Sequence, residues 1–218
     1  MGYEVHEMAV DTLINKYGGE ILATGVTFED YLDRFAGMHC ELVDGNVIKM
    51  SPIHERHDKL VRYGSLLFEA YFALNPIGEI RQDPFVMSTL PELPKRQPDI
   101  QVILKTNGGR LTPTFMDGPA DIVIEITSPG TEEVDRGDKF VEYEKGGVRE
   151  YWIFDPLRRE SLFYRLNADG IYMPQSLDEN GNYQTPLLPG LLIHVPTLWK
   201  DPLPNFFAVG KAVQDMLK

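Results

Sequence analysis

Apolar and polar residues follow a two-residue period most clearly between positions 121 and 127. Residues 122 to 126 read Ile-Val-Ile-Glu-Ile, which predicts a buried central strand. Because side chains alternate along a strand, Asp121, Val123, Glu125 and Thr127 are expected on one face. A carboxylate in such a run is costly to bury unless it binds a proton, a cation or a metal. Glu125 is therefore the first candidate for a functional residue.

Other segments show the spacing of helices or of strands. Apolar residues at helical spacing predict helices over 7–17, 28–35, 57–74, from the 128–130 turn to about 144, and over 205–218. Strand patterns predict a hairpin over 41–50, one or two strands over 78–87, further strands over 97–104, 148–154 and 161–166, and short strands within 168–195. The turn of the hairpin is expected at Asp44-Gly45.

The helix that follows the central strand carries an informative spacing. Asp135, Lys139 and Tyr143 lie four residues apart and share a face. Gly137 lies between the first two, although glycine costs a helix about 1 kcal/mol relative to alanine. Either the helix starts late and is capped by Asp135, or another backbone group approaches Gly137 closely. Lys139 either reaches the central strand or pairs with Asp135 on a solvated face.

The composition is that of one globular domain. The chain has 218 residues, of which 43% are hydrophobic and 25% charged. We expect an N-terminal helical arm (1–26), a main domain (27–200) and a C-terminal helical tail (201–218). Apolar segments are too short to span a membrane. The single cysteine, Cys40, excludes an intramolecular disulfide and a cysteine-based zinc cluster, and it suits a reducing compartment, so a cytoplasmic location is expected.

The net charge of −12 argues against broad, nonspecific binding of nucleic acid. The charge is uneven, because residues 1–50 contain nine acidic and three basic residues. Any contact with DNA would therefore be local and assisted by a metal ion.

Several polar residues are predicted at strand ends or on a central strand. Glu41 begins the hairpin, Asp99 lies near the start of the 97–104 strand, and Glu125 lies on the central strand, with Lys139 on the following helix. Carboxylates that converge at one end of a sheet would bind Mg²⁺, which uses one or two carboxylates, several waters and a phosphate. Such a metal polarises a phosphoryl oxygen, and a nearby ammonium neutralises developing charge. This inventory points to phosphodiester hydrolysis.

An ordered set of motifs resembles one family. The set comprises Glu41-Leu-Val-Asp-Gly, Pro98-Asp99, Ile124-Glu125-Ile-Thr-Ser128-Pro129, Asp135-Arg-Gly-Asp-Lys139, Tyr143 and Glu150-Tyr-Trp-Ile-Phe-Asp155-Pro156. It is similar to the bacterial Uma-type restriction-endonuclease family, a former domain of unknown function within the PD-(D/E)XK nuclease superfamily. The resemblance covers about residues 27–200. It implies an α/β (α+β) fold with a restriction-endonuclease-like core, in which helices flank a mixed β-sheet, and extra C-terminal β-strands.

The resemblance also implies roles for individual residues. Asp99 would be the PD acid, Glu125 the second metal ligand, and Glu41 the early acid that completes a site for Mg²⁺, with Mn²⁺ as a substitute. Thr127 stands where the superfamily motif has lysine, and Lys139 resembles the migrated replacement found in the family. His57 and Tyr143 are expected to contact these site residues and to hold them in position without binding the metal themselves.

Three functions are consistent with these features. The first is a Mg²⁺-dependent endodeoxyribonuclease, for which two cuts in a duplex would suit a homodimer. The second is a catalytically inactive nuclease-fold module that binds nucleic acid or a protein partner, which the acidic charge and Thr127 favour. The third is a hydrolase of small phosphoesters, which fits the carboxylates but not the family resemblance.

Overall fold

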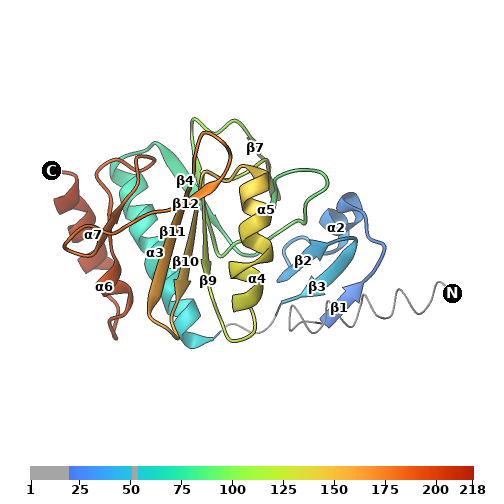
Figure 1. The fold of residues 1–218 in the computed structure, drawn as a ribbon, viewed down its shortest axis with the longest axis horizontal. Coiled ribbons are helices and arrows are strands. Elements are labelled where there is room, and N and C mark those ends of the chain that lie inside the picture. Colours follow the sequence, from blue (N-terminus) through green and yellow to red (C-terminus); the bar gives the residue numbers. More distant parts are fainter. Residues whose placement is uncertain (1–19, 51–53) are drawn as a thin grey trace.

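A mixed six-stranded sheet forms the centre of the molecule (Figure 1), a computed structural model that describes residues 20–50 and 54–218. The strand order is β12-β11-β10-β9-β6-β4. These strands are β4 (Gly78–Gln82), β6 (Ile100–Leu104), β9 (Ile122–Ile126), β10 (Glu150–Asp155), β11 (Glu160–Leu166) and β12 (Tyr172–Pro174). Only β9 and β10 pair in parallel, and the other neighbours are antiparallel.

The predicted central strand is confirmed as β9. Every residue of β6, β9 and β10 is buried, as expected for strands covered on both faces. Ile122, Ile124 and Ile126 pack in a core with helices α3 (Glu55–Leu74) and α7 (Phe206–Met216), whereas Val123 belongs to a second core with Tyr143. Helices α4 (Glu132–Arg136) and α5 (Asp138–Gly146) lie on that second face (Figure 1). Glu125 points toward it by alternation.

Smaller sheets surround this centre. A three-stranded sheet in the order β1-β3-β2 contains β1 (Glu20–Ala23), β2 (Cys40–Val43) and β3 (Asn46–Lys49), and α2 (Phe28–Arg34) lies between β1 and β2 in the chain. The others are β5 (Val86–Ser88), β8 (Phe115–Asp117) and β7 (Arg110–Leu111), and the pair β13 (Asn182–Gln184) and β14 (Leu192–His194), after which comes α6 (Val195–Leu198). Backbone bonds between Leu42 and Lys95 join β2 to the segment that precedes Asp99.

Most predicted elements are confirmed, with differences near the ends. The predicted helix over 7–17 lies outside the described residues. Within the arm expected to be helical up to residue 26, Glu20–Ala23 instead forms β1, because its backbone pairs with β3. The predicted tail helix exists as α7, and its residues Val209 and Val213 are buried in the core beside α3. Among the described helices, none is both long and apolar enough to cross a membrane.

The helix predicted after β9 is interrupted at Gly137, the residue for which the sequence left two explanations open. α4 ends at Arg136 and α5 begins at Asp138, so Gly137 separates two helices. A Cβ at Gly137 would lie 2.7 Å from the carbonyl oxygen of Glu133. Close approach of the backbone therefore explains the glycine, and α5 then ends at Gly147, whose φ of 82° is the left-handed conformation that glycine favours.

Candidate active site

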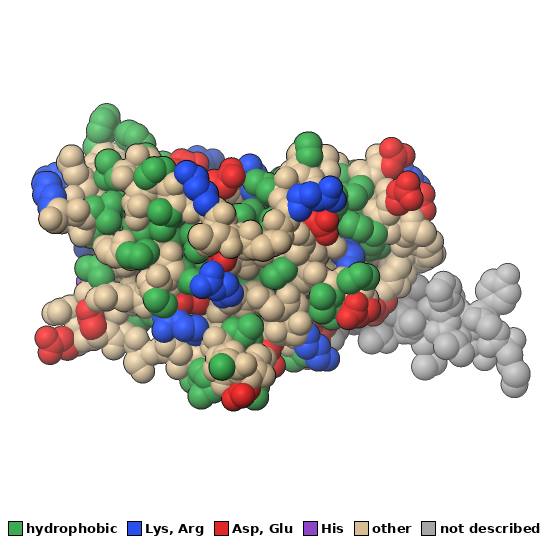
Figure 2. All heavy atoms as spheres, turned by 90° about the horizontal axis from the view of Figure 1, so that it is seen from above, with side chains coloured by type: hydrophobic (Ala, Val, Ile, Leu, Met, Phe, Trp, Pro, Cys, Tyr) green, Lys and Arg blue, Asp and Glu red, His purple; other side chains and the backbone are tan. Residues whose placement is uncertain are grey.

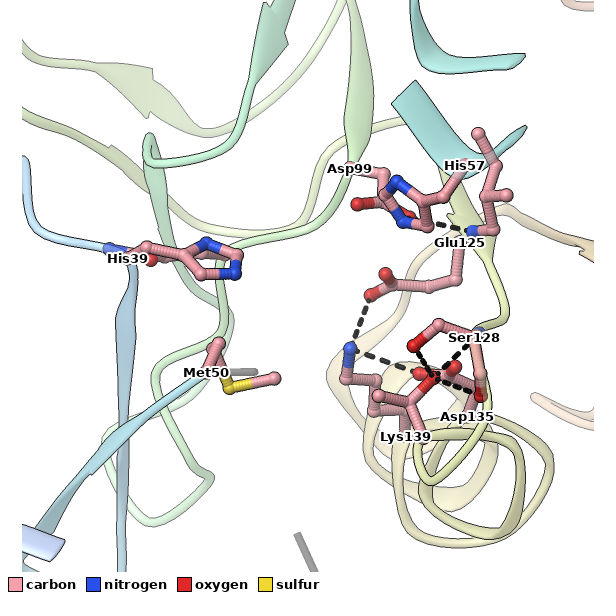
Figure 3. A pocket seen from close by; sticks show the side chains of 11 residues that line it. His39, Met50, His57, Asp99, Glu125, Ser128, Asp135 and Lys139 are labelled. Atoms are coloured by element: carbon pink, nitrogen blue, oxygen red, sulfur yellow. Dashed lines mark hydrogen bonds and ion pairs between the residues drawn. The ribbon is translucent and has the colours of Figure 1, made fainter. Parts of the chain in front are cut away.

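A narrow pocket of about 50 Å³ lies where β9 ends and β6 begins. Its polar lining includes His39, His57, Asp99, Glu125, Asp135 and Lys139 (Figure 3). His39 projects from one wall, and the carboxylates and Lys139 lie on the opposite wall. Because β6 and β9 are antiparallel, the residue before β6 and the last residues of β9 meet at the same end of the sheet.

Asp99 is held by both neighbouring elements. Its Oδ2 accepts a hydrogen bond from the backbone N–H of Ile126 at 2.7 Å and lies 3.0 Å from Nε2 of His57 in the first turn of α3. Among the described residues, these contacts engage Oδ2 and leave Oδ1 without a hydrogen bond. The side chain is fixed in place with one oxygen available to a ligand.

Glu125 is almost completely buried, with 3% of the residue exposed. Its Oε1 accepts hydrogen bonds from Lys139 Nζ at 3.0 Å and from the Tyr143 hydroxyl at 2.8 Å. Burial raises the pKa of Glu125 well above its usual value, and the charges of Asp99, Asp135 and Glu41 raise it further, against the opposite effect of Lys139. The site therefore favours a bound proton or a cation at this carboxylate.

Lys139 occupies the centre of a carboxylate cluster. Its Nζ lies 3.0 Å from Glu125 Oε1, 3.1 Å from Asp135 Oδ1 and 3.7 Å from Glu41 Oε1. Burial alone would lower the pKa of Lys139, but the three carboxylates raise it well above its usual value. The raised pKa favours the charged form of the lysine, which reaches β9 from α5, one of the two positions that the sequence left open. Thr127, the residue after β9, is buried and has no charge to offer.

Glu41 is brought to the cluster but faces other partners. Its Oε2 lies 2.6 Å from Arg96 Nη1, and its Oε1 accepts a hydrogen bond from the Gln97 backbone N–H at 3.2 Å. Burial would raise the pKa of Glu41, but Lys139 and Arg96 lower it below its usual value. Arg96 also forms a two-pronged pair with Glu142 of α5, at 2.7 and 2.8 Å. These contacts favour a role for Glu41 in positioning Lys139, and its role as a metal ligand stays a prediction.

The two residues expected behind the site lie beside its carboxylates. Tyr143 donates to Glu125, and burial followed by the charge of Glu125 raises the pKa of Tyr143 well above its usual value. His57 contacts Asp99, whose hydrogen bond and charge raise the pKa of His57 although burial lowers it. Asp121 precedes β9, and the sequence did not place it in the site. Its carboxylate accepts hydrogen bonds from Arg149, Asn107 and the backbone N–H of Leu104.

Sequence reasoning did not identify four residues at or beside this site. Asp135 and His39 line the pocket together with Gln97, and Arg96 binds Glu41. The spacing of Asp135 and Lys139 was a usable signal, but it could not show that both side chains are buried. The other three depend on how distant segments pack, and no local pattern marks them.

The pocket offers carboxylate oxygens, which are the ligands that a hard divalent cation prefers. Three carboxylates, those of Glu41, Glu125 and Asp135, surround the ammonium of Lys139, and the charge of Asp99 acts on Glu125 and Asp135. Among residues 20–50 and 54–218, however, no group of three or more His, Cys, Asp or Glu side chains is arranged to hold a metal ion. Asp99 and Glu125 alone are the smaller set that Mg²⁺ uses when waters and a phosphate complete its shell.

Comparison with known proteins agrees with the fold. The family model Uma2, described as "Putative restriction endonuclease", matches residues 27–196. A crystal structure from Anabaena variabilis ATCC 29413, described as a "putative nuclease belonging to DUF820", superposes with a TM-score of 0.64 at 16% identity, and the match covers 80% of this chain and 97% of that one. No curated protein has a significant sequence match to the chain.

Proposed function

Since the chain belongs to the Uma2 family, whose model is described as "Putative restriction endonuclease", we propose that it is a metal-dependent endonuclease acting on DNA. The bond to be hydrolysed is a phosphodiester, and the metal is Mg²⁺, for which Mn²⁺ would substitute. A homodimer and a cytoplasmic location remain predictions from the sequence. The fold similarity supports the architecture, and the residues of the pocket support the chemistry.

One observation supports this proposal above the others. Asp99 and Glu125 line one pocket, and Lys139 lies 3.0 Å from Glu125 although fourteen residues separate them in the chain. A buried carboxylate is unfavourable unless its charge is balanced. The carboxylates of the cluster are buried in spite of this unfavourable energy, and they lie beside a pocket.

Each residue can be given a task in hydrolysis. Asp99 Oδ1 and the second oxygen of Glu125 would hold the cation, while His57 and the Ile126 N–H keep Asp99 oriented. When bound, the cation would polarise a phosphoryl oxygen and lower the pKa of a water. Lys139 and Tyr143 fix Oε1 of Glu125, which leaves that carboxylate one direction in which to bind.

The surface is consistent with a local contact to DNA. On the face shown in Figure 2, basic and acidic side chains of the described residues are interspersed, and no broad basic patch forms there. The net charge of −12 agrees with that distribution. Binding would therefore rely on the cation at the pocket more than on a positively charged groove.

An inactive nucleic-acid-binding module is the second candidate. It is favoured by the engagement of Lys139, whose ammonium has three donors and three carboxylate partners within 3.7 Å. Glu125 and Asp135 lie within hydrogen-bond distance of the ammonium and Glu41, at 3.7 Å, does not, so at most one donor is left for a substrate. In this alternative the cluster is only a structural tie between α5, β2 and β9.

Cleavage of supercoiled plasmid distinguishes these functions. We expect the purified chain to nick plasmid with Mg²⁺ or Mn²⁺ and not with EDTA, and Glu125→Ala to abolish nicking. Glu179→Ala, at an exposed position, is the matched control and should cut normally. DNA binding without metal-dependent cutting would support the inactive module. Hydrolysis of bis(p-nitrophenyl) phosphate without cutting of DNA would support a small-phosphoester hydrolase.

A further inference from the structure

A second and larger cavity adjoins the candidate active site. It has a volume of about 510 Å³, within the range of cavities that enclose small molecules. Its lining includes Glu69 of α3, the segment Ile80–Phe85 and the turn Pro113–Thr114. None of these residues belongs to the carboxylate cluster, and no role in the proposed chemistry uses them.

The cavity lies at the same end of the sheet as Asp99. In the antiparallel pair of β4 and β6, Gln82 is opposite Ile100, so Asp83 follows β4 where Asp99 precedes β6. Asp83 lines the larger cavity, and its Oδ2 lies 2.7 Å from Nδ1 of His39, which lines the active-site pocket. The Asp83–His39 pair is therefore a wall shared by the two cavities.

Flat and polar groups face each other in this cavity. The guanidinium of Arg81 lies 5.6 Å from the centre of the Phe85 ring, and Pro84 and Pro113 add further flat surfaces. Such surfaces suit a planar aromatic ligand, since bases stack on aromatic rings and on arginine. The cavity therefore has the volume and the lining for a nucleobase.

Its hydrogen-bonding groups include both donors and acceptors. Arg81 uses Nη1 for the Ile80 carbonyl and Glu79, and its Nε and Nη2 have no partner among the described residues. Asp83 Oδ1 is buried and, within the described part of the chain, accepts no hydrogen bond. Buried carboxylate oxygens are normally paired, so this atom lacks a donor, but it is enclosed and meets a ligand only when the Asp83 side chain moves. The exposed carboxylate of Glu69 offers a further acceptor.

We propose that this cavity binds a guanine base of the substrate, unstacked from its neighbours and close to the bond that is cut. Guanine presents the acceptors O6 and N7 to an arginine and N–H donors to a carboxylate, so both kinds of group in the cavity are satisfied at once. Adenine lacks that pair of acceptors, and cytosine, which offers N3 and O2, lacks the neighbouring N–H donors that guanine presents at N1 and N2. The place of this base in a substrate rests on the proposed function, but the binding of guanine does not. An extrahelical or single-stranded guanine is required, because a paired base cannot enter the cavity.

Calorimetric titration with mononucleotides, in EDTA so that their phosphate does not bind through a metal ion, tests the proposal. We expect GMP to bind about tenfold or more tightly than AMP or CMP. Arg81→Ala should weaken GMP binding at least about tenfold, and Arg81→Lys should also lose the preference because it lacks the planar fork. Arg110→Ala is the matched control, since Arg110 is exposed and pairs with Asp117 in a different cavity.

Clear outcomes contradict the proposal. Equal binding of all mononucleotides, no binding of GMP at millimolar concentration, or unchanged binding in folded Arg81→Ala and Arg81→Lys proteins would each refute it. Circular dichroism of both variants verifies the fold. Failure of the proposed function is recognised separately, because the wild type would then show no metal-dependent nicking of plasmid, or Glu125→Ala would nick it equally, whether or not GMP binds.

Discussion

The Nζ atom of Lys139 lies 3.0 Å from Oε1 of Glu125, so the cation of α5 is joined directly to the one carboxylate of the buried strand β9. Asp135 and Glu41 share the same ammonium. This contact places a positive charge next to a carboxylate whose pKa is raised by burial. The behaviour of the candidate site should follow from this balance.

Lys139→Met should destabilise the fold strongly. The change leaves Glu125, Asp135 and Glu41 without their shared cation, and breaking a buried ion pair from one side costs about 3–5 kcal/mol. Urea unfolding would measure the difference in the free energy of unfolding. Lys211→Met, which removes an exposed pair with Asp215, is the control and should change stability by less than about 1 kcal/mol. Equal effects of the two changes would show that the cluster is not maintained in solution.

The stability difference between Glu125→Gln and the wild type should depend on pH. The folded protein holds a proton on Glu125 at pH values where an unfolded glutamate, with a usual pKa of 4.5, has lost it. By linkage, the wild type loses stability as the pH rises from that value through the raised pKa of the folded state. Glutamine cannot ionise, so the stability of the variant relative to that of the wild type should increase as the pH increases. A difference that is constant with pH would contradict a raised pKa.

Tyr143→Phe should impair the site with little change of shape. It removes the hydroxyl that donates to Glu125 Oε1 at 2.8 Å. Loss of a group that orients a metal ligand typically reduces metal affinity or activity by about 10–100-fold. Tyr164→Phe is a suitable control, because Tyr164 packs against Phe140 away from the pocket lining. Nicking rates at several Mn²⁺ concentrations would separate an effect on metal affinity from an effect on activity. An unchanged rate would show that Tyr143 has no role in the site.

Gly137→Ala should disturb the junction that aims Asp135 and Lys139. The new Cβ would lie 2.7 Å from the Glu133 carbonyl oxygen, so the backbone must shift at a cost of about 1–3 kcal/mol. In Gly210→Ala nothing lies within 4 Å of the new Cβ on α7. That change should be neutral or stabilising by up to about 1 kcal/mol. Thermal unfolding of both variants makes the comparison, and a harmless Gly137→Ala would mean that the junction is not tight.

The sequence predicts the secondary structure well where a local signal exists. The apolar run around Glu125 reveals β9, and Asp44-Gly45 reveals the β2–β3 turn, where both residues have positive φ. The spacing of Asp135 and Lys139 shows that they are neighbours. Whether their shared face meets solvent or the sheet depends on how α5 packs, and periodicity cannot decide that.

Other contacts lie beyond any local pattern. Arg96 meets Glu41 because the backbone of Leu42 pairs with that of Lys95, which joins segments 53 positions apart. His39 reaches the pocket through its contact with Asp83, another distant residue. Such contacts arise from tertiary packing. The sequence also predicts Glu41 as a third carboxylate ligand of the metal. In the structure the Glu41 carboxylate contacts Arg96, and this contact too depends on tertiary packing that no local pattern indicates.

Titration of the folded protein with Mn²⁺, followed by calorimetry, tests the central claim that Asp99 and Glu125 hold one divalent cation. We expect one ion per chain in the wild type, with affinity that increases with pH as the proton leaves Glu125. Asp99→Asn and Glu125→Gln should each weaken this binding by more than about tenfold. Equal Mn²⁺ binding by the wild type and both variants, or no binding by the wild type, would contradict the claim.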